Sequence, residues 1–261
     1  MTDSENSIIC YLDILGYGEL VKKSPPDKTI IYKNLQKIIE GKYAVSGKSG
    51  VKPIADAVEI QIISDSILLT LDLNNPPVGI KYPKENEKQQ FCAHVFLTIV
   101  GWVCFNGLYA LGHLLRGAIT KGQHYQQSLY NERNQFIFSK ALVEATELEK
   151  VADVPRILLS ADLQSFLATD TSFDYRRRVS TDSDGLSYLD IYACSLGPPP
   201  VPEDILQGIR AIAKTMRPPK NISDLKVLRK YYWFQNYHNV KIQKCISEKQ
   251  LPDSRELLIE L

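Results

Sequence analysis

Two aspartates near the start of the chain each stand where an apolar run ends. Asp13 lies between the runs IICYL and ILGYG, and Asp65 lies between EIQIIS and SILLTLDL. Carboxylates are hard oxygen ligands, so two of them held together can bind one or two magnesium ions while substrate phosphates complete the coordination. Such a site favours in-line attack at phosphorus, because one cation activates a hydroxyl and the other neutralises the leaving group. A lone aspartate at a strand end, by contrast, only caps a turn.

The segment that follows the first aspartate is suited to hold phosphates. It contains two glycines, which let backbone N–H groups approach an anion closely. We therefore expect the backbone of this segment to cradle phosphate oxygens. Its residues are Ile14, Leu15, Gly16, Tyr17 and Gly18.

Cations must balance the charge of a bound triphosphate. Arg116 is one candidate, because a guanidinium contacts phosphate through two parallel hydrogen bonds; the alternative is an ion pair between strands or at an interface. Lys121 and Lys140 are weaker candidates, and a solvated surface position is the expected one for both. The four histidines follow no metal-binding spacing and are expected to be structural.

The pattern of apolar residues predicts the elements that position these side chains. In chain order it predicts a strand over 8–12, a helix over 29–40, a hairpin over 57–73, a helix over 91–111, a strand over 114–122, a helix over 138–151 capped by Ser139, a strand over 155–160, a short helix over 162–167 and a strand over 186–193. This order predicts an α+β protein with a ferredoxin-like βαββαβ core, an antiparallel sheet with helices on one face. In that core the first strand lies beside the hairpin, so Asp13 and Asp65 should meet.

The last third of the chain is expected to add to this core. Residues 175–184 are polar and are predicted to be mobile. We predict a catalytic domain over 1–196 and a helical C-terminal extension over 197–261, with a long amphipathic helix over 223–246. The aromatic cluster of that helix either docks it onto the core or lies over a nucleotide pocket or a partner groove.

Composition excludes several classes of protein. The 261 residues are 44% hydrophobic and 23% charged, unlike a disordered chain, a collagen-like repeat or a coiled-coil rod. With 31 Lys and Arg against 30 Asp and Glu, there is no basic field for a nucleic acid. Five scattered cysteines without a CxxC pair, and an N-terminus without a basic region, favour a cytoplasmic protein without a signal peptide.

The run over residues 91–111 is long and apolar enough to span a bilayer. It contains His94, Thr98 and Asn106, however, and no basic cluster flanks it. We therefore predict no membrane span but a helix buried in the core or at a dimer interface.

Four segments resemble successive signatures of the class III nucleotidyl cyclases: YLDILGYG, IISDSILLT, LLRGAITKG and FIFSKALVEATELE. The resemblance covers roughly residues 8–159. The RGAI strand, the ALVEATELE helix and the KYYWFQNYHN stretch look most like the bacterial pyrimidine cyclases of Pycsar anti-phage defence, which make cyclic UMP or cyclic CMP to activate an effector protein. The resemblance implies a homodimer whose sites form between two subunits, with two Mg²⁺ or Mn²⁺ ions per site. It implies metal binding by Asp13, Ile14 and Asp65, and catalytic roles for Asp13, Asp65 and Arg116.

The chain differs from the purine cyclases of this family at positions that contact the nucleotide. Val143 and Glu147 stand where purine cyclases carry an asparagine and an arginine that act on the ribose and the transition state. Gln61 and Phe136 stand where adenylate cyclases carry the lysine and aspartate that read adenine, so adenine read in the usual way is not expected. Gln61 and Phe136 are instead predicted to contact the base, although a phenylalanine there is also suited to the core.

These observations predict a pyrimidine nucleotide cyclase that converts UTP, or CTP, to the 3′,5′-cyclic monophosphate and pyrophosphate, with UTP favoured on resemblance alone. Two other functions stay open. One is a non-catalytic cyclase-like domain that binds a nucleotide or a partner, which the missing asparagine and arginine favour. The other is a palm-type oligonucleotide synthase, because palm domains share this core and its two-metal chemistry.

Overall fold

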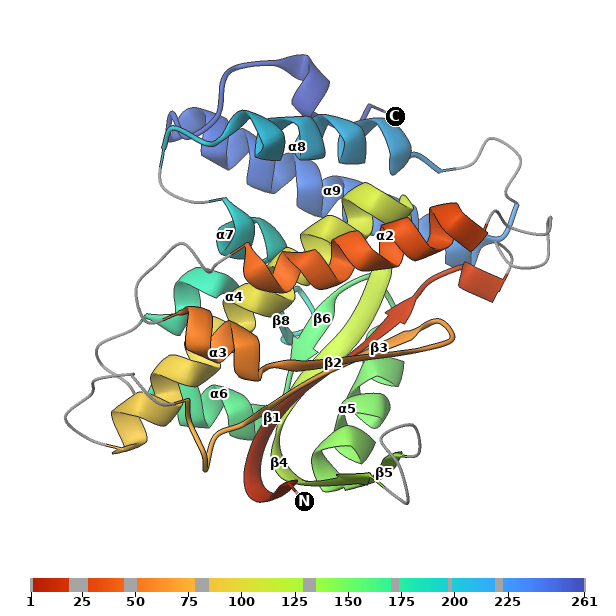
Figure 1. Ribbon diagram of the computed structural model, residues 1–261. Coiled ribbons are helices and arrows are strands. Elements are labelled where there is room, and N and C mark those ends of the chain that lie inside the picture. The colour runs from red at the N-terminus through yellow and green to blue at the C-terminus, as the bar shows by residue number, and fades with distance from the viewer. Residues whose placement is uncertain are drawn as a thin grey trace.

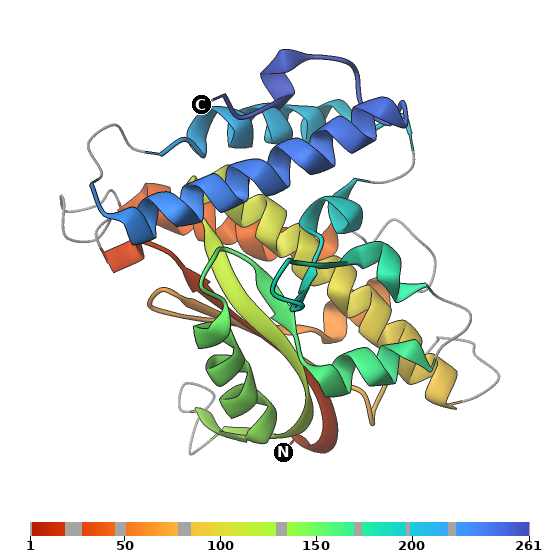
Figure 2. The ribbon, with the colours of Figure 1, turned by 180° about the vertical axis from the view of Figure 1, so that it is seen from behind.

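The computed structural model describes residues 2–18, 28–44, 51–77, 85–128, 135–169, 174–196, 199–218 and 223–260. Over these residues the chain forms an eight-stranded sheet with helices on both faces (Figures 1 and 2). The strands are β1 Thr2–Ile14, β2 Glu59–Ile63, β3 Ser66–Asp72, β4 Leu115–Ser128, β5 Gln135–Ser139, β6 Ile157–Leu159, β7 Val179–Thr181 and β8 Ser187–Leu189. The α-helices are α2 Lys28–Glu40, α3 Lys52–Ala57, α4 Glu85–Leu111, α5 Lys140–Val151, α6 Ala161–Ala168, α7 Ile191–Ser195, α8 Glu203–Thr215 and α9 Leu225–Ser247, and the short 3₁₀ helices are η1 Gly41–Tyr43, η2 Tyr175–Arg178 and η3 Arg255–Leu257.

The strand order confirms the ferredoxin-like core. Within the sheet the strands run β2-β3-β1-β4-β6-β8-β7, and β5 pairs with the far end of β4. The first four are antiparallel neighbours, and the chain visits them as strand, helices, hairpin, helix, strand. β4 and β6 pair in parallel, and β8 and β7 extend the sheet beyond the core. The protein is therefore an α+β protein, as the sequence predicts.

The two faces of the sheet differ, because side chains alternate along each strand. On β1, Ile8 and Leu12 enter the large core, which also contains buried residues of α4. Ile9 points to the opposite face, where it packs against Leu68 of β3 and Ala141 of α5. Asp13 follows Ile9 by four residues and therefore lies on the face that α5 covers.

Helix α4 is a core helix. By length and composition it could cross a membrane, but 78% of its most apolar stretch is buried inside the protein. It packs against α2, α7 and α8, and Cys194 of α7 approaches so closely that a Cβ atom at Gly101 would lie 2.2 Å from the Cys194 Cβ. The sequence predicts that this helix is buried either in the core or at a dimer interface, and the structure favours the core.

Several predicted boundaries are wrong. β1 begins at Thr2 and not at residue 8, and residues 135–139 form β5, so that α5 starts only at Lys140. Ser139 is the predicted N-cap and accepts a hydrogen bond from the backbone N–H of Leu142. Helix α3 was not expected from the sequence.

The expected strand over 186–193 is present as β8 but shorter than predicted, because a helix follows it. Only Ser187–Leu189 is extended, and the Asp190 carboxylate then accepts a hydrogen bond from the backbone N–H of Ala193, which starts α7. The segment over 175–184, predicted to be mobile, forms η2 and then β7, which pairs with β8.

Gly117 allows β1 and β4 to approach each other closely. A Cβ atom at this position would lie 2.2 Å from the carbonyl oxygen of Tyr11 and 2.8 Å from Cδ2 of Leu12. We expect Gly117→Ala to cost about 2–3 kcal/mol of stability, because the strand backbones would have to separate. Urea unfolding measures this; the matched control is Gly18→Ala, where a Cβ atom meets nothing within 4 Å. Equal stability of the two variants would contradict this prediction.

The C-terminal helix α9 is anchored by its aromatic and polar side chains. Phe234, Tyr237 and His238 are buried. The hydroxyl of Tyr237 donates to Asp190 at 3.0 Å and accepts from the backbone N–H of Ile191 at 2.8 Å. Docking onto the core, one of the two expected uses of the aromatic cluster, is therefore confirmed for these residues.

His238 makes the fold sensitive to acid. Its Nε2 lies 2.7 Å from the carbonyl oxygen of Leu257 and its Nδ1 contacts the Tyr192 hydroxyl, an arrangement that fits a neutral ring donating from Nε2. Burial lowers the pKa of His238 from 6.5 to about 4. Between these values the unfolded chain binds the proton and the folded chain does not, so stability falls as the pH falls through this window.

We therefore expect a loss of about 2 kcal/mol from this group between pH 7 and pH 5, measured by urea unfolding. His238→Gln is the matched control, because the amide keeps a donor and an acceptor but does not titrate. If the variant lost as much stability as the wild type over this range, His238 would not be the source of the sensitivity.

Candidate active site

Asp13 and Asp65 come together at the end of two neighbouring strands. Asp13 on β1 lies opposite Ser66, the first residue of β3, and directly opposite Cα atoms in an antiparallel pair are about 4.5–5.5 Å apart. Asp65 is the residue before Ser66, in the β2–β3 turn, and its carbonyl oxygen accepts a hydrogen bond of 2.8 Å from the backbone N–H of Ile14. The backbones of Asp13 and Asp65 therefore lie beside each other at this end of the sheet.

Arg116 joins Asp13 to a third acid. It lies opposite Asp13 on β4, and its Nη2 is 3.5 Å from Oδ2 of Asp13. Its Nε forms an ion pair with Oε1 of Glu149, which is on α5 and only 7% exposed. The structure thus shows Arg116 in the ion pair between strands that was one of its two expected roles, with Glu149 as a further partner.

Both acids that share Arg116 have raised pKa values. Burial raises the pKa of Asp13; Arg116 opposes this, while the charge of Asp65 adds to it. Burial likewise raises the pKa of Glu149, with Arg116 opposing and Asp13 adding. Asp13 and Asp65 therefore interact as two like charges, an arrangement that a cation would stabilise.

A second cation acts on this site from the C-terminal helix. The positive charge of Lys230, which is half-buried on α9, lowers the pKa of Asp13 against the effect of burial. No local sequence pattern indicates this interaction, because Lys230 follows Asp13 by more than two hundred residues. Arg116 is therefore the main positive charge that acts on Asp13, and Lys230 adds a smaller effect from α9.

The expected phosphate cradle is only partly available. The N–H of Ile14 is bonded to Asp65, and the N–H of Leu15 donates to the carbonyl oxygen of Leu114 at 2.9 Å. These two groups are therefore wrong as phosphate donors, because sheet and turn pairing already uses them. Gly16 has a φ of +81°, which glycine adopts without strain, and Tyr17 and Gly18 are helical. Residues 16–18 remain the part of the segment suited to phosphate.

Gln61 and Phe136 lie at opposite ends of the sheet. Gln61 on β2 is opposite Leu68, which is in turn opposite Tyr11, so Gln61 shares the sheet face of Asp13. Phe136 on β5 pairs with Gln127, eleven residues beyond Arg116 (127 − 116) along β4 and therefore roughly 36 Å away along the strand. Phe136 is 47% exposed, so it is not a core residue. The structure thus does not bring the Phe136 side chain of the same chain to the aspartates.

The other positions singled out from the sequence lie outside this cluster. Val143 and Glu147 are exposed on α5, and so is Lys140. Lys121 stacks over the ring of Phe166, with Nζ 4.8 Å from the ring centroid.

The acids at the end of β1 fit a divalent cation bound jointly with a substrate. Among the described residues, no group of three or more His, Cys, Asp or Glu side chains is arranged to hold a metal by itself. Asp13 and Asp65 supply two carboxylates whose charges repel, which is the donor chemistry that Mg²⁺ and Mn²⁺ prefer. Phosphate oxygens of a substrate would have to complete the coordination.

Comparison with known proteins gives structural similarity without a sequence family. No protein-family model matches the sequence, and no curated protein matches it either. Among solved structures, the chain is similar to the adenylyl cyclase CyaB from P. aeruginosa, with 13% identity over 72% of this chain and 95% of the other, at a TM-score of 0.49. It is also similar to a dimeric guanylyl cyclase domain from Blastocladiella emersonii (10% identity, 72% and 98% coverage, TM-score 0.45) and to a guanylate cyclase domain from Catenaria anguillulae in complex with GTP (11%, 73% and 98%, TM-score 0.42).

Proposed function

We propose that this protein is a nucleotidyl cyclase that acts on a nucleoside triphosphate. The observation that carries the proposal is the meeting of Asp13 and Asp65 at the ends of adjacent strands of a ferredoxin-like sheet. Arg116 pairs with Asp13 there, and the positive charge of Lys230 acts on the same carboxylate. The resemblance of the four sequence segments to class III cyclases supports the same activity.

In this proposal Asp13 and Asp65 hold two Mg²⁺ or Mn²⁺ ions against the triphosphate. When bound, such ions increase the acidity of the 3′-hydroxyl and stabilise the charge of the pyrophosphate leaving group. Arg116 opposes protonation of the Asp13 carboxylate, and its remaining N–H groups are able to bind phosphate. Rate enhancement then comes from positioning and charge stabilisation, without a covalent intermediate on the protein.

We propose further that the base is a pyrimidine, with UTP favoured over CTP. Gln61 shares the face of Asp13 and offers an amide that can pair with a base edge. Phe136 can reach an active site only from a second copy of the chain, so this proposal requires a homodimer in which each copy completes the site of the other. The cytoplasm as location, the cyclic UMP or cyclic CMP product, and its role in activating an effector protein in anti-phage defence rest on the sequence resemblance.

The test is to incubate the protein with each of the four nucleoside triphosphates and Mn²⁺ and to identify the products by mass spectrometry. We expect a 3′,5′-cyclic mononucleotide from UTP or CTP and pyrophosphate in equal amount. Cyclic AMP or cyclic GMP as the main product would leave the cyclase proposal standing and remove the pyrimidine preference.

The same experiment separates the two alternatives. Linear or cyclic dinucleotides would identify a palm-type synthase. Absence of any product from all four nucleotides would remove the enzyme proposal and favour the non-catalytic nucleotide-binding domain. Val143 and Glu147 support that alternative, because they are exposed and stand where purine cyclases carry an asparagine and an arginine.

A further inference from the structure

The core and the C-terminal helix α9 are separated in one place by an open hollow. A hollow of about 610 Å³ opens between the end of α5, the β7–β8 turn and the first turns of α9. This volume is within the range of pockets that take small molecules, which commonly form where two parts of a protein meet. Asp13, Asp65 and Arg116 do not line it.

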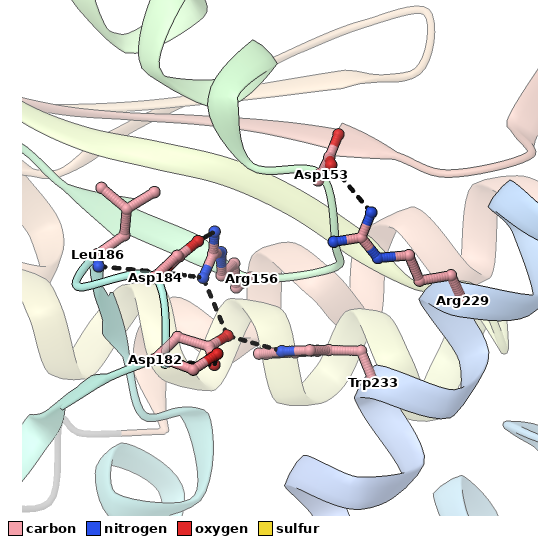
Figure 3. A network of polar contacts seen from close by, with 8 residues as sticks. Asp153, Arg156, Asp182, Asp184, Leu186, Arg229 and Trp233 are labelled. Carbon is pink, nitrogen blue, oxygen red and sulfur yellow. Dashed lines mark hydrogen bonds and ion pairs between the residues drawn. The ribbon is translucent and has the colours of Figure 1, made fainter.

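The floor of this hollow is rigidly built (Figure 3). The Arg156 side chain is only 3% exposed, and its Nη1 donates to Asp182 at 2.9 Å and to Asp184 at 3.0 Å. Asp182 also accepts a hydrogen bond of 2.8 Å from Nε1 of Trp233 on α9, and Asp184 accepts from the backbone N–H of Leu186 at 3.1 Å. The turn, the buried arginine and α9 are therefore fixed before any ligand binds, which lowers the entropic cost of binding.

The walls of the hollow are apolar and partly aromatic. Leu225 is 78% exposed, Val151 54% and Tyr232 48%, which is unusual for three large apolar side chains that line one hollow. Trp233 lies beside them, and its ring stacks on Tyr237 at 5.5 Å between centroids. These walls offer a ligand apolar area and aromatic faces.

The charges of the hollow favour a cation. Its lining contains three acids, Asp153, Asp182 and Asp184, and two arginines, Arg156 and Arg229, so the formal sum is one negative charge. Arg229 forms an ion pair with Asp153, with 3.2 Å between Nη1 and Oδ2. Arg156 forms ion pairs with both Asp182 and Asp184. Asp184 remains 46% exposed. A carboxylate beside aromatic rings attracts an organic cation through both its charge and the faces of the rings.

We propose that this hollow is a binding site for a small organic cation with a flat apolar body. The body lies against Leu225, Tyr232 and Trp233, and the positive charge lies toward Asp184. The site is separate from the aspartates at the end of β1, so it stands whether or not the protein is a cyclase.

The test uses the fluorescent cation thioflavin T with the full chain. The protein has two tryptophans, so Trp102→Phe leaves Trp233 as the only donor for energy transfer to the bound dye. We expect one dye per chain, with quenching of Trp233. Leu225→Lys places a repelling charge on the wall and should weaken binding about tenfold. Tyr232→Leu keeps apolar area but removes the ring, and should weaken binding about threefold.

Two matched controls locate the dye. Val240→Lys places the same charge on the same helix at a side chain that is 53% exposed and does not line the hollow, and should change binding less than about twofold. Val143→Lys does the same at a second apolar hollow, on α5. The proposal is overturned if the dye does not bind, if Leu225→Lys and Val240→Lys bind it equally, or if Val143→Lys is the variant that loses it. It is also overturned if the anion anilinonaphthalene sulfonate displaces the dye and Leu225→Lys binds this anion as tightly as the wild type does.

Discussion

Asp65→Asn is expected to abolish formation of the cyclic nucleotide while the protein stays folded. Asn keeps the size of the side chain and the backbone carbonyl that pairs with Ile14, but it lacks the charge that would bind a divalent cation. A metal ion contributes several kcal/mol of transition-state stabilisation, so we expect activity to fall about 1000-fold. Initial rates of pyrophosphate release at saturating Mn²⁺ measure the loss.

Stability should respond in the opposite direction from activity. Removing the charge of Asp65 relieves its repulsion with Asp13, so Asp65→Asn should unfold at the same or a slightly higher urea concentration than the wild type. Asp162→Asn, an exposed aspartate on α6, is the matched control and should keep full activity. Activity of Asp65→Asn within tenfold of the wild type would rule out a two-metal site at these aspartates.

The acidity of Asp13 adds a pH dependence to the same reaction. Because burial and Asp65 raise the pKa of Asp13, its carboxylate takes up a proton at a higher pH than an ordinary aspartate does. A protonated Asp13 cannot bind a cation, so metal binding should be lost on acidification earlier than an unperturbed aspartate would predict.

The core of the fold was predictable because its signals are local. Alternating or continuous apolar residues mark β1, the β2–β3 hairpin and β4, and their order along the chain allows few other arrangements. The convergence of Asp13 and Asp65 follows from that order alone, because β3 must lie beside β1 in a ferredoxin-like sheet. The sequence therefore predicts that Asp13 and Asp65 lie near each other without any knowledge of their surroundings.

The surroundings of the aspartates were not predictable, because they depend on contacts between distant segments. Glu149 reads as a surface helix residue, yet the docking of α5 on β4 buries it against Arg116. Lys230 belongs to a helix whose position relative to β1 no local pattern encodes. The N–H groups of Ile14 and Leu15 were assigned to phosphate because a glycine-rich segment suggests free donors, and only the three-dimensional pairing shows that they are used.

The short strand β7 was not predicted, and β8 was predicted too long, for a related reason. β7 and β8 have three residues each, too few for a periodic pattern to be read. They are stabilised from outside: Lys241 of α9 forms an ion pair of 2.5 Å with Asp190 and donates to the Ser180 hydroxyl at 2.7 Å. Residues 175–184 look polar and irregular because their partners lie elsewhere in the chain.

Replacing Arg116 by methionine is expected to cost about 3–5 kcal/mol of stability near neutral pH, the largest effect we expect on folding. Methionine fills much of the same volume, but it leaves the buried Glu149 without a counter-charge and Asp13 without its partner. Without arginine the folded-state pKa of Glu149 should rise further, because the main group that opposes the effect of burial is then gone. Since the folded state then binds a proton more readily than the unfolded chain, the loss should be greatest above that pKa and shrink as the pH falls through it.

Urea unfolding of three further variants assigns this loss to the charges. Arg116→Met combined with Glu149→Leu removes the arginine and the more deeply buried of its two acids, so it should recover most of the stability. Arg116→Lys keeps one positive charge and should lie between wild type and Arg116→Met. Arg217→Met removes an exposed arginine that pairs with Glu260 and should cost less than about 1 kcal/mol. If Arg116→Met cost no more stability than Arg217→Met, the ion pairs of Arg116 would contribute no more than surface contacts do. Strand pairing alone would then hold the residues at the end of β1 in place.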